Sequence, residues 1–126
     1  MLWAKGVAEF VDAARRLRDR GLAVSMTLVG APDPENPGSV PEGALRDWHR
    51  EGIVQWWGRR EDIERIWRAC HICALPSYYR EGVPKALLEA AACGRPIVTT
   101  DTPGCREIVR DGENGILVPP RDAAAL

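Results

Sequence analysis

Polar and apolar positions along the chain follow two alternating periods. Val7, Phe10 and Ala14 recur at the spacing of a helix that buries one face, and this pattern ends at Gly21. Later segments repeat the helical spacing or carry helix-start signals such as Pro41. The helices predicted in this way cover residues 5–20, 41–49, 61–70, 84–93 and 105–109, and another begins in 121–126.

Short apolar runs separate these helices. The run HICALPS, residues 71–77, is nearly all apolar, which is typical of a parallel strand covered by helices on both faces. The predicted strands cover residues 23–30, 52–58, 71–77, 95–101 and 115–120. Regular alternation of strand and helix predicts an α/β fold with a Rossmann-like, doubly wound parallel sheet.

Length and composition fit one globular domain. The chain has 126 residues, of which 45% are hydrophobic and 28% are charged. Its net charge of −1 argues against a broad basic surface for nucleic acid or anionic membrane. No apolar run approaches the roughly 20 residues of a transmembrane helix, and the N-terminus does not suit a signal peptide. We therefore expect a cytoplasmic protein with no nucleic-acid partner and no transmembrane segment.

The cysteines give one motif to consider. Cys70 and Cys73 have the C-x-x-C spacing of zinc and redox sites, but no second pair follows them. Both lie in an apolar helix-to-strand stretch, and free cysteine commonly behaves as a small buried hydrophobe. We expect reduced, buried thiols, with metal or redox chemistry as the alternative.

The segment EGVPKALLE places two carboxylates around a helix start, at the strand edge where such sheets bind ligands. Glu81 and Glu89 should lie on the order of 10 Å apart, too far to share a proton or one metal ion. Gly82 allows close approach of a ligand, Pro84 suits the first helical position, and the free N–H groups there attract anions. The spacing fits two hydroxyl-bearing rings on either side of an anionic linker, and it fits a solvated helix equally well.

Four stretches of the chain resemble the GT4 family of retaining glycosyltransferases, or glycosyl transferases group 1. EGVPKALLEAAACGRPIVTTD resembles the E-x7-E segment, and residues 104–118 resemble the tail G-x-x-E-x-V-x-x-G-x-x-G-x-L-V. Upstream, LWAKGVAEFVDAARRL resembles the K-G segment, and WWGRREDIERIWRACHICALPSYYREG resembles the stretch ending in L-P-S. The resemblance covers essentially the whole chain, in order and spacing.

This resemblance implies roles for individual residues. Glu81 would be the catalytic-site carboxylate against the donor sugar hydroxyls, Glu89 would hold the ribose, and Lys5 would contact the diphosphate. The remaining implied contacts are Gly82 and Val83 at the sugar and diphosphate, and Gly58 and Arg59 along the base, mostly through backbone groups. No acid cluster suits a divalent metal, so we expect neither a metal nor another cofactor.

The resemblance also implies a two-domain enzyme of GT-B architecture, with the active site between two Rossmann-like domains. Residues 1–126 would be the C-terminal domain that binds the nucleotide-sugar, without the N-terminal acceptor domain and apparently without its own first strand and last helices. The intact enzyme would be a hexosyltransferase acting with retention on a glycan or lipid-linked saccharide acceptor, in the cytoplasm or peripherally at the inner membrane face. This chain alone would be inactive.

Two expectations remain open at this stage. A non-enzymatic nucleotide-binding or assembly module with glycosyltransferase ancestry is the alternative function. The missing strand would leave a gap between residues 23–29 and 71–76. Because buried backbone groups without partners are costly, we expect a homo-oligomer that covers this gap, unless the two strands pair directly or preceding residues fill it.

Overall fold

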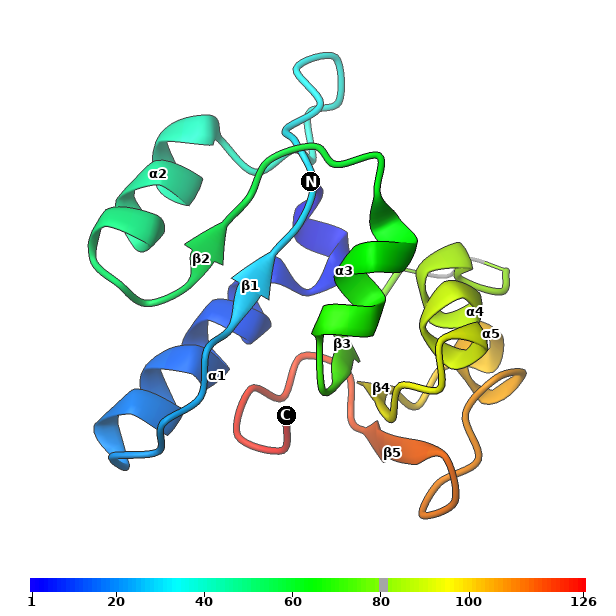
Figure 1. Ribbon diagram of the computed structural model, residues 1–126. Helices are drawn as coiled ribbons and strands as arrows, with labels where there is room; N and C mark the ends of the chain where they lie inside the picture. The colour runs from blue at the N-terminus through cyan, green and yellow to red at the C-terminus, as the bar shows by residue number, and fades with distance from the viewer. Residues whose placement is uncertain (80–81) are drawn as a thin grey trace.

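Helices and strands alternate along the chain, as the pattern predicts (Figure 1). A computed structural model describes residues 1–79 and 82–126. Its helices are the 3-10 helix η1 (Trp3–Lys5), α1 (Val7–Asp19), α2 (Glu42–Arg50), α3 (Ile63–Ala69), α4 (Lys85–Ala92) and α5 (Pro103–Arg106). Its strands are β1 (Thr27–Leu28), β2 (Gln55–Trp56), β3 (Cys73–Leu75), β4 (Ile97–Thr100) and β5 (Gly115–Val118).

The strands are parallel and form two sheets. β1 pairs with β2 in one sheet, and the other has the order β3-β4-β5. Within the described residues, β1 and β3 each have one edge that pairs with no other strand. The predicted α/β class with parallel strands is confirmed, and β1 and β3 do not pair directly with each other.

Two hydrophobic clusters hold these sheets. The first joins α1, α2, β1 and the residues before β2, with Val11, Val40 and Leu45 almost fully buried. The second joins β3 and β4 to α4 and α5 through Leu87, Ala90, Ile97 and Cys105, among others. Alternate residues of β3 serve the two clusters, because Cys73 belongs to the second and Ala74 packs against the first. β3 therefore connects the two halves of the core.

Several element boundaries differ from the prediction. Every strand is shorter than its apolar run. The helix predicted at 105–109 lies instead at Pro103–Arg106, because Pro103 takes the first helical position after the extended Thr102. Residues 121–126 form turns rather than a regular helix. There the Asp122 carboxylate accepts hydrogen bonds from the N–H groups of Ala124 and Ala125, each 3.0 Å long.

Candidate functional site

The start of α4 lies just beyond the carboxyl edge of the three-stranded sheet. The sequence predicts Pro84 as the first helical residue, but it is the buried, extended N-cap, and the helix begins one residue later, at Lys85. The Pro84 carbonyl accepts the first bonds, from the N–H groups of Leu87 and Leu88. The N–H groups of Lys85 and Ala86 precede these bonds, and they carry the positive end of the helix dipole. This end of α4 can therefore receive an anion.

Glu89 lies in the second turn of α4, with its side chain 33% exposed. Its Oε1 is 3.3 Å from Nζ of Lys85, whose side chain is 87% exposed. The sequence suggests only a solvent-exposed Lys85, so this ion pair is an addition from the structure. Such exposed pairs are worth little, and a ligand hydroxyl can replace the lysine at low cost.

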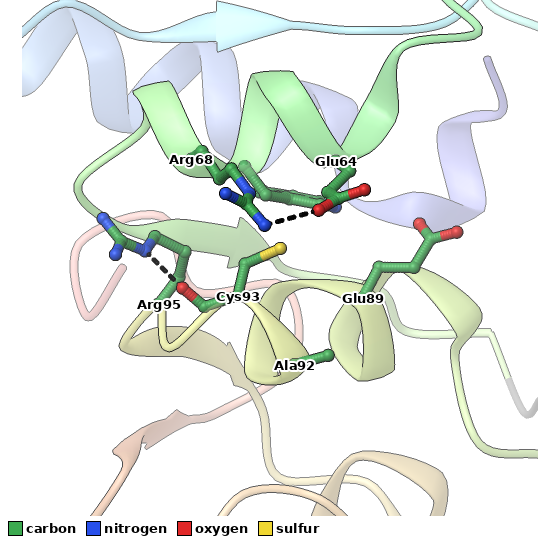
Figure 2. Close-up of a pocket in the computed structure, with 7 residues that line it drawn as sticks. Glu64, Arg68, Glu89, Ala92, Cys93 and Arg95 are labelled. Carbon is green, nitrogen blue, oxygen red and sulfur yellow. Dashed lines mark hydrogen bonds and ion pairs between the residues drawn. The ribbon is translucent and has the colours of Figure 1, made fainter.

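Glu89 opens onto a cavity of about 510 Å³ between α3 and α4. Figure 2 shows Glu89 and Glu64 near one end of this cavity and Arg95 at the other. Arg68 pairs with Glu64 at 2.7 Å, and Arg95 donates to the carbonyl oxygens of Cys93 and Cys70, each at 3.0 Å. The charged side chains that line the cavity therefore have partners, whereas the buried Nε1 of Trp67, which also lines it, has no hydrogen-bond partner among the described residues.

Lys5 is positioned by close contact between the start of α1 and the loop after β3. Gly6 has a φ of 77°, and a Cβ atom there would lie 2.1 Å from the carbonyl oxygen of Pro76. The N–H of Tyr78 donates to Ala4 O at 3.0 Å, and Ser77 Oγ donates to the same oxygen at 3.3 Å. Lys5, the last residue of η1, therefore lies between two residues that contact the loop after β3.

Arg121 approaches the same loop from the end of β5. Its guanidinium carbon lies 4.4 Å from the centroid of the Tyr78 ring, within the range of a cation–π contact. The sequence predicts Arg121 at the start of a further helix, and nothing in it pairs Arg121 with Tyr78.

Gly58 and Arg59 lie at the end of β2. They line a separate cavity of about 630 Å³, together with the proline-rich loop 31–41 and Trp56. Gly58 has a φ of 67°, and its carbonyl accepts a 2.7 Å hydrogen bond from Gly30 N–H. The structure thus places the predicted base-lining residues and Glu89 in different cavities.

The loop after Gly58 carries a fixed ion pair. Arg60 and Asp62 form two hydrogen bonds, 2.8 and 2.7 Å long. The hydrogen bond from Arg60 holds the pKa of Asp62 below its usual value, so this carboxylate stays ionised. Asp62 is the N-cap residue of α3.

Other predicted residues differ in how far the structure describes them. Glu81 lies outside the described residues. Gly82 and Val83 are exposed just before α4, with Val83 at 45%.

Within the described ranges, no three His, Cys, Asp or Glu side chains come together as metal ligands. No helix in that part of the chain is long and apolar enough to cross a membrane.

The C-x-x-C motif is split between two environments. Cys73 is fully buried in the second cluster, and burial, with a smaller effect of Cys70, raises its pKa to about 12. Cys70 is half-buried and ends α3. A thiol with so high a pKa is poorly suited to redox or metal chemistry near neutral pH.

Parallel strands that alternate with helices define an α/β domain. The sequence profile of the family described as Glycosyl transferases group 1 matches residues 1–126. The chain belongs to this family, and the resemblance drawn from its motifs is confirmed.

Curated relatives extend this result. The chain is 38% identical over 125 residues to an N,N'-diacetylbacillosaminyl-diphospho-undecaprenol α-1,3-N-acetylgalactosaminyltransferase of Campylobacter jejuni, covering 99% of the chain and 31% of that protein. It is 33% identical over 129 residues to the amylovoran biosynthesis glycosyltransferase AmsK of Erwinia amylovora, covering 97% and 31%. The chain therefore spans about a third of the length of these relatives.

Solved structures agree on the fold. HepE of Anabaena in complex with UDP matches with a TM-score of 0.79 and 28% identity, covering 96% of this chain and 33% of that one. The complex of the same protein with UDP-glucose gives a TM-score of 0.76 and 26% identity, covering 98% and 34%. The predicted Rossmann-like half of a glycosyltransferase fold is thus supported at the level of structure.

Proposed function

We propose that residues 1–126 form the donor-binding domain of a glycosyltransferase that transfers a sugar from a nucleotide-sugar to an acceptor. The observation that carries the proposal is the start of α4, where the first N–H groups have no hydrogen-bond acceptor among residues 1–79 and 82–126 and lie one turn from Glu89. The loop before this helix start is hydrogen-bonded to Ala4, the residue before Lys5. The relatives named above are glycosyltransferases, and one structural neighbour was solved with UDP-glucose. The rest of the intact protein would supply the acceptor-binding domain.

In this proposal each side chain has a separate task. Glu89 accepts hydrogen bonds from the ribose hydroxyls, displacing Lys85. The first N–H groups of α4 and the ammonium of Lys5 contact the diphosphate. Glu81 faces the donor sugar, while Gly82 and Val83 bring backbone groups close to it. The base lies toward Gly58 and Arg59, which requires the ligand to extend past the start of α3 from one cavity to the other.

The reaction proposed for the intact enzyme is hexosyl transfer with retention at the anomeric carbon. As the glycosidic bond to the diphosphate breaks, negative charge develops on the leaving phosphate oxygens. Lys5 and the N-terminal dipole of α4 stabilise that charge where it forms. No metal or other cofactor is part of the proposal. We place the reaction in the cytoplasm or at the inner membrane face, on a glycan or lipid-linked acceptor, and expect the 126-residue chain alone to be inactive.

Binding of nucleotides to the 126-residue chain tests the donor site. Isothermal titration with UDP, GDP and ADP should identify at least one ligand. Glu89→Gln should lower the affinity for that ligand by about tenfold, because a charged hydrogen-bond acceptor is lost. Asp12→Asn is the matched control, since Asp12 forms a similar i,i+4 ion pair with Arg16 on α1, outside both cavities. Equal losses in both variants, or no binding by the unaltered chain, would contradict the proposal.

Transfer by the full-length protein tests Glu81. Glu81→Gln should reduce turnover and leave the affinity for the nucleoside diphosphate nearly unchanged, because that ligand lacks the sugar. A panel of nucleotide-sugars then identifies the donor. If Glu81→Gln weakens nucleoside diphosphate binding as much as Glu89→Gln does, the separate roles of the two carboxylates are wrong.

A further inference from the structure

Arg121 holds a backbone conformation that side chains disfavour. Its φ is 61°, and it is the one residue other than glycine with a positive φ among residues 1–79 and 82–126. The left-handed conformation costs a residue with a side chain on the order of 1 kcal/mol relative to glycine. Such strain persists where surrounding contacts hold it, and it clusters at functional sites.

In the part of the chain that the structure describes, one contact holds the side chain of Arg121. Its guanidinium stacks over the ring of Tyr78, with 4.4 Å from carbon to ring centroid. The neighbouring carboxylate of Asp122 is already engaged with the N–H groups of Ala124 and Ala125. No carboxylate in the described ranges forms an ion pair with Arg121, and the residue is exposed. A stacked guanidinium keeps its N–H edge available for a planar acceptor.

The position of Arg121 brings it to the proposed substrate. It follows β5, whose last residue Val118 is in register with Thr100 of β4, so it lies at the carboxyl edge of the sheet. Its partner Tyr78 is hydrogen-bonded through its N–H to Ala4, the residue before Lys5. Tyr78 thus lies between two segments that carry a cation: its ring contacts Arg121 after β5, and its N–H bonds to the residue before Lys5, the last residue of η1.

We propose that Arg121 is a second anion-binding residue of this site, held by Tyr78 to donate to a phosphate group of the substrate. This inference rests on the proposed function and adds a residue to it. A guanidinium fork matches two phosphate oxygens, and it adds geometric selectivity that the ammonium of Lys5 cannot provide. The phosphate is either in the donor diphosphate or on a phosphorylated acceptor, since both present the same oxyanion.

Arg121→Gly distinguishes an effect on ligand affinity from an effect on the stability of the fold. Glycine adopts the positive φ without strain, so the thermal unfolding temperature should stay the same or rise. The affinity for the phosphate ligand should fall by about tenfold in low salt, and this difference should shrink as salt is added. Arg110→Ala is the control, because it removes one exposed positive charge from the turn before β5.

Titration of the 126-residue chain with uridine, UDP, inorganic pyrophosphate and farnesyl diphosphate identifies the source of the phosphate. Weaker UDP and pyrophosphate binding in Arg121→Gly, with uridine unchanged, assigns Arg121 to the donor. A loss confined to farnesyl diphosphate assigns it to a phosphorylated lipid acceptor. Tyr78→Leu should reproduce part of either loss. If Arg121→Gly binds UDP and every other phosphate ligand with unchanged affinity, this inference is overturned and the proposed function is left intact. If the unaltered chain does not bind UDP, both the inference and the proposed function are contradicted.

Discussion

At Gly6 the backbone of one segment touches the backbone of another that is far away in the sequence. The chain turns there with φ at 77°, and the carbonyl of Pro76 occupies the space of a side chain. This contact fixes where Lys5 lies relative to the end of β3. In the Lys5–Gly6 pair, the glycine therefore serves the packing that positions the lysine.

Gly6→Ala should destabilise the fold by on the order of 3 kcal/mol, because its Cβ would lie 2.1 Å from the Pro76 oxygen and one backbone must move. Urea unfolding measures this change. Gly43→Ala is the control, since it lies inside α2 with open space around it and should stabilise by up to about 1 kcal/mol. Similar stability in both variants would show that the Gly6–Pro76 contact is not tight.

The thiol of Cys73 should make stability fall at high pH. Its pKa is raised from 9.0 to about 12 in the folded state, mainly by burial. Below pH 9 both states keep the proton, so this thiol adds no pH dependence. Between pH 9 and about 12 the unfolded thiol ionises and the folded one does not, which favours unfolding.

Cys73→Ala isolates that effect from other groups that titrate in the same range. Its unfolding free energy should decrease less between pH 9 and pH 11 than that of the unaltered chain. If the unfolding free energy falls equally with pH in the two proteins, the Cys73 thiol ionises as readily in the folded state as in the unfolded state.

Among single residues, the sequence predicts those whose role is local. The position of Glu89 on its helix is predicted correctly because helical geometry fixes a residue within two turns of a helix start, while its role stays a prediction. The Lys85–Glu89 pair was within reach of the same reasoning, since residues four apart on a helix are neighbours. The Arg121–Tyr78 contact was not, because it depends on how separate loops meet at the sheet edge.

At the scale of elements, the apolar runs locate each strand but overestimate its length. Residues 23–30 are a mainly apolar segment that predicts one strand, yet only Thr27–Leu28 pair as strand. The run begins before the ladder because Val24 N–H bonds back to Leu22 O in a turn, and β1 has a partner on one side only. Pairing depends on the neighbouring strand, and the apolar pattern carries no information about it.

The β4–β5 pair offers a test at this scale. Gly115 stands opposite Ile97, and a Cβ atom there would lie 2.2 Å from the Ile97 carbonyl oxygen. Gly115→Ala should push β5 away from β4 and increase amide hydrogen exchange along Ile97–Thr100 by at least about tenfold. Ile116→Ala, at a position 56% exposed in the same strand, should change exchange little. Unchanged exchange in Gly115→Ala would show that β5 adapts without loss of pairing.

For the whole molecule, strand–helix alternation is sufficient to predict the α/β class, whereas ligand binding at the carboxyl edge stays a prediction. The alternation does not predict that Gly58 and Glu89 line different cavities, because α3 lies between them by tertiary packing. The unpaired edges of β1 and β3 follow from topology rather than from any local motif.

Those edges lead us to expect association of the 126-residue chain. Strand edges with unpaired N–H and C=O groups favour pairing with another copy. Light scattering at micromolar concentration should give a mass of a dimer or larger. A monodisperse monomer that unfolds in one cooperative step would show that the edges are covered within a single copy.

The division of the core into two clusters has a consequence for ligand binding. Lys5 precedes α1 of the first cluster, and Glu89 lies on α4 of the second, while among the described strands and helices only β3 contributes to both clusters. The two halves can therefore behave as separate cooperative units that open at different free energies. A ligand that contacts Lys5 and Glu89 together binds only while the two halves are packed together, so its binding stabilises that packing. Substitutions at this junction would then change affinity without touching the ligand, and a bound nucleotide would make two unfolding events merge into one.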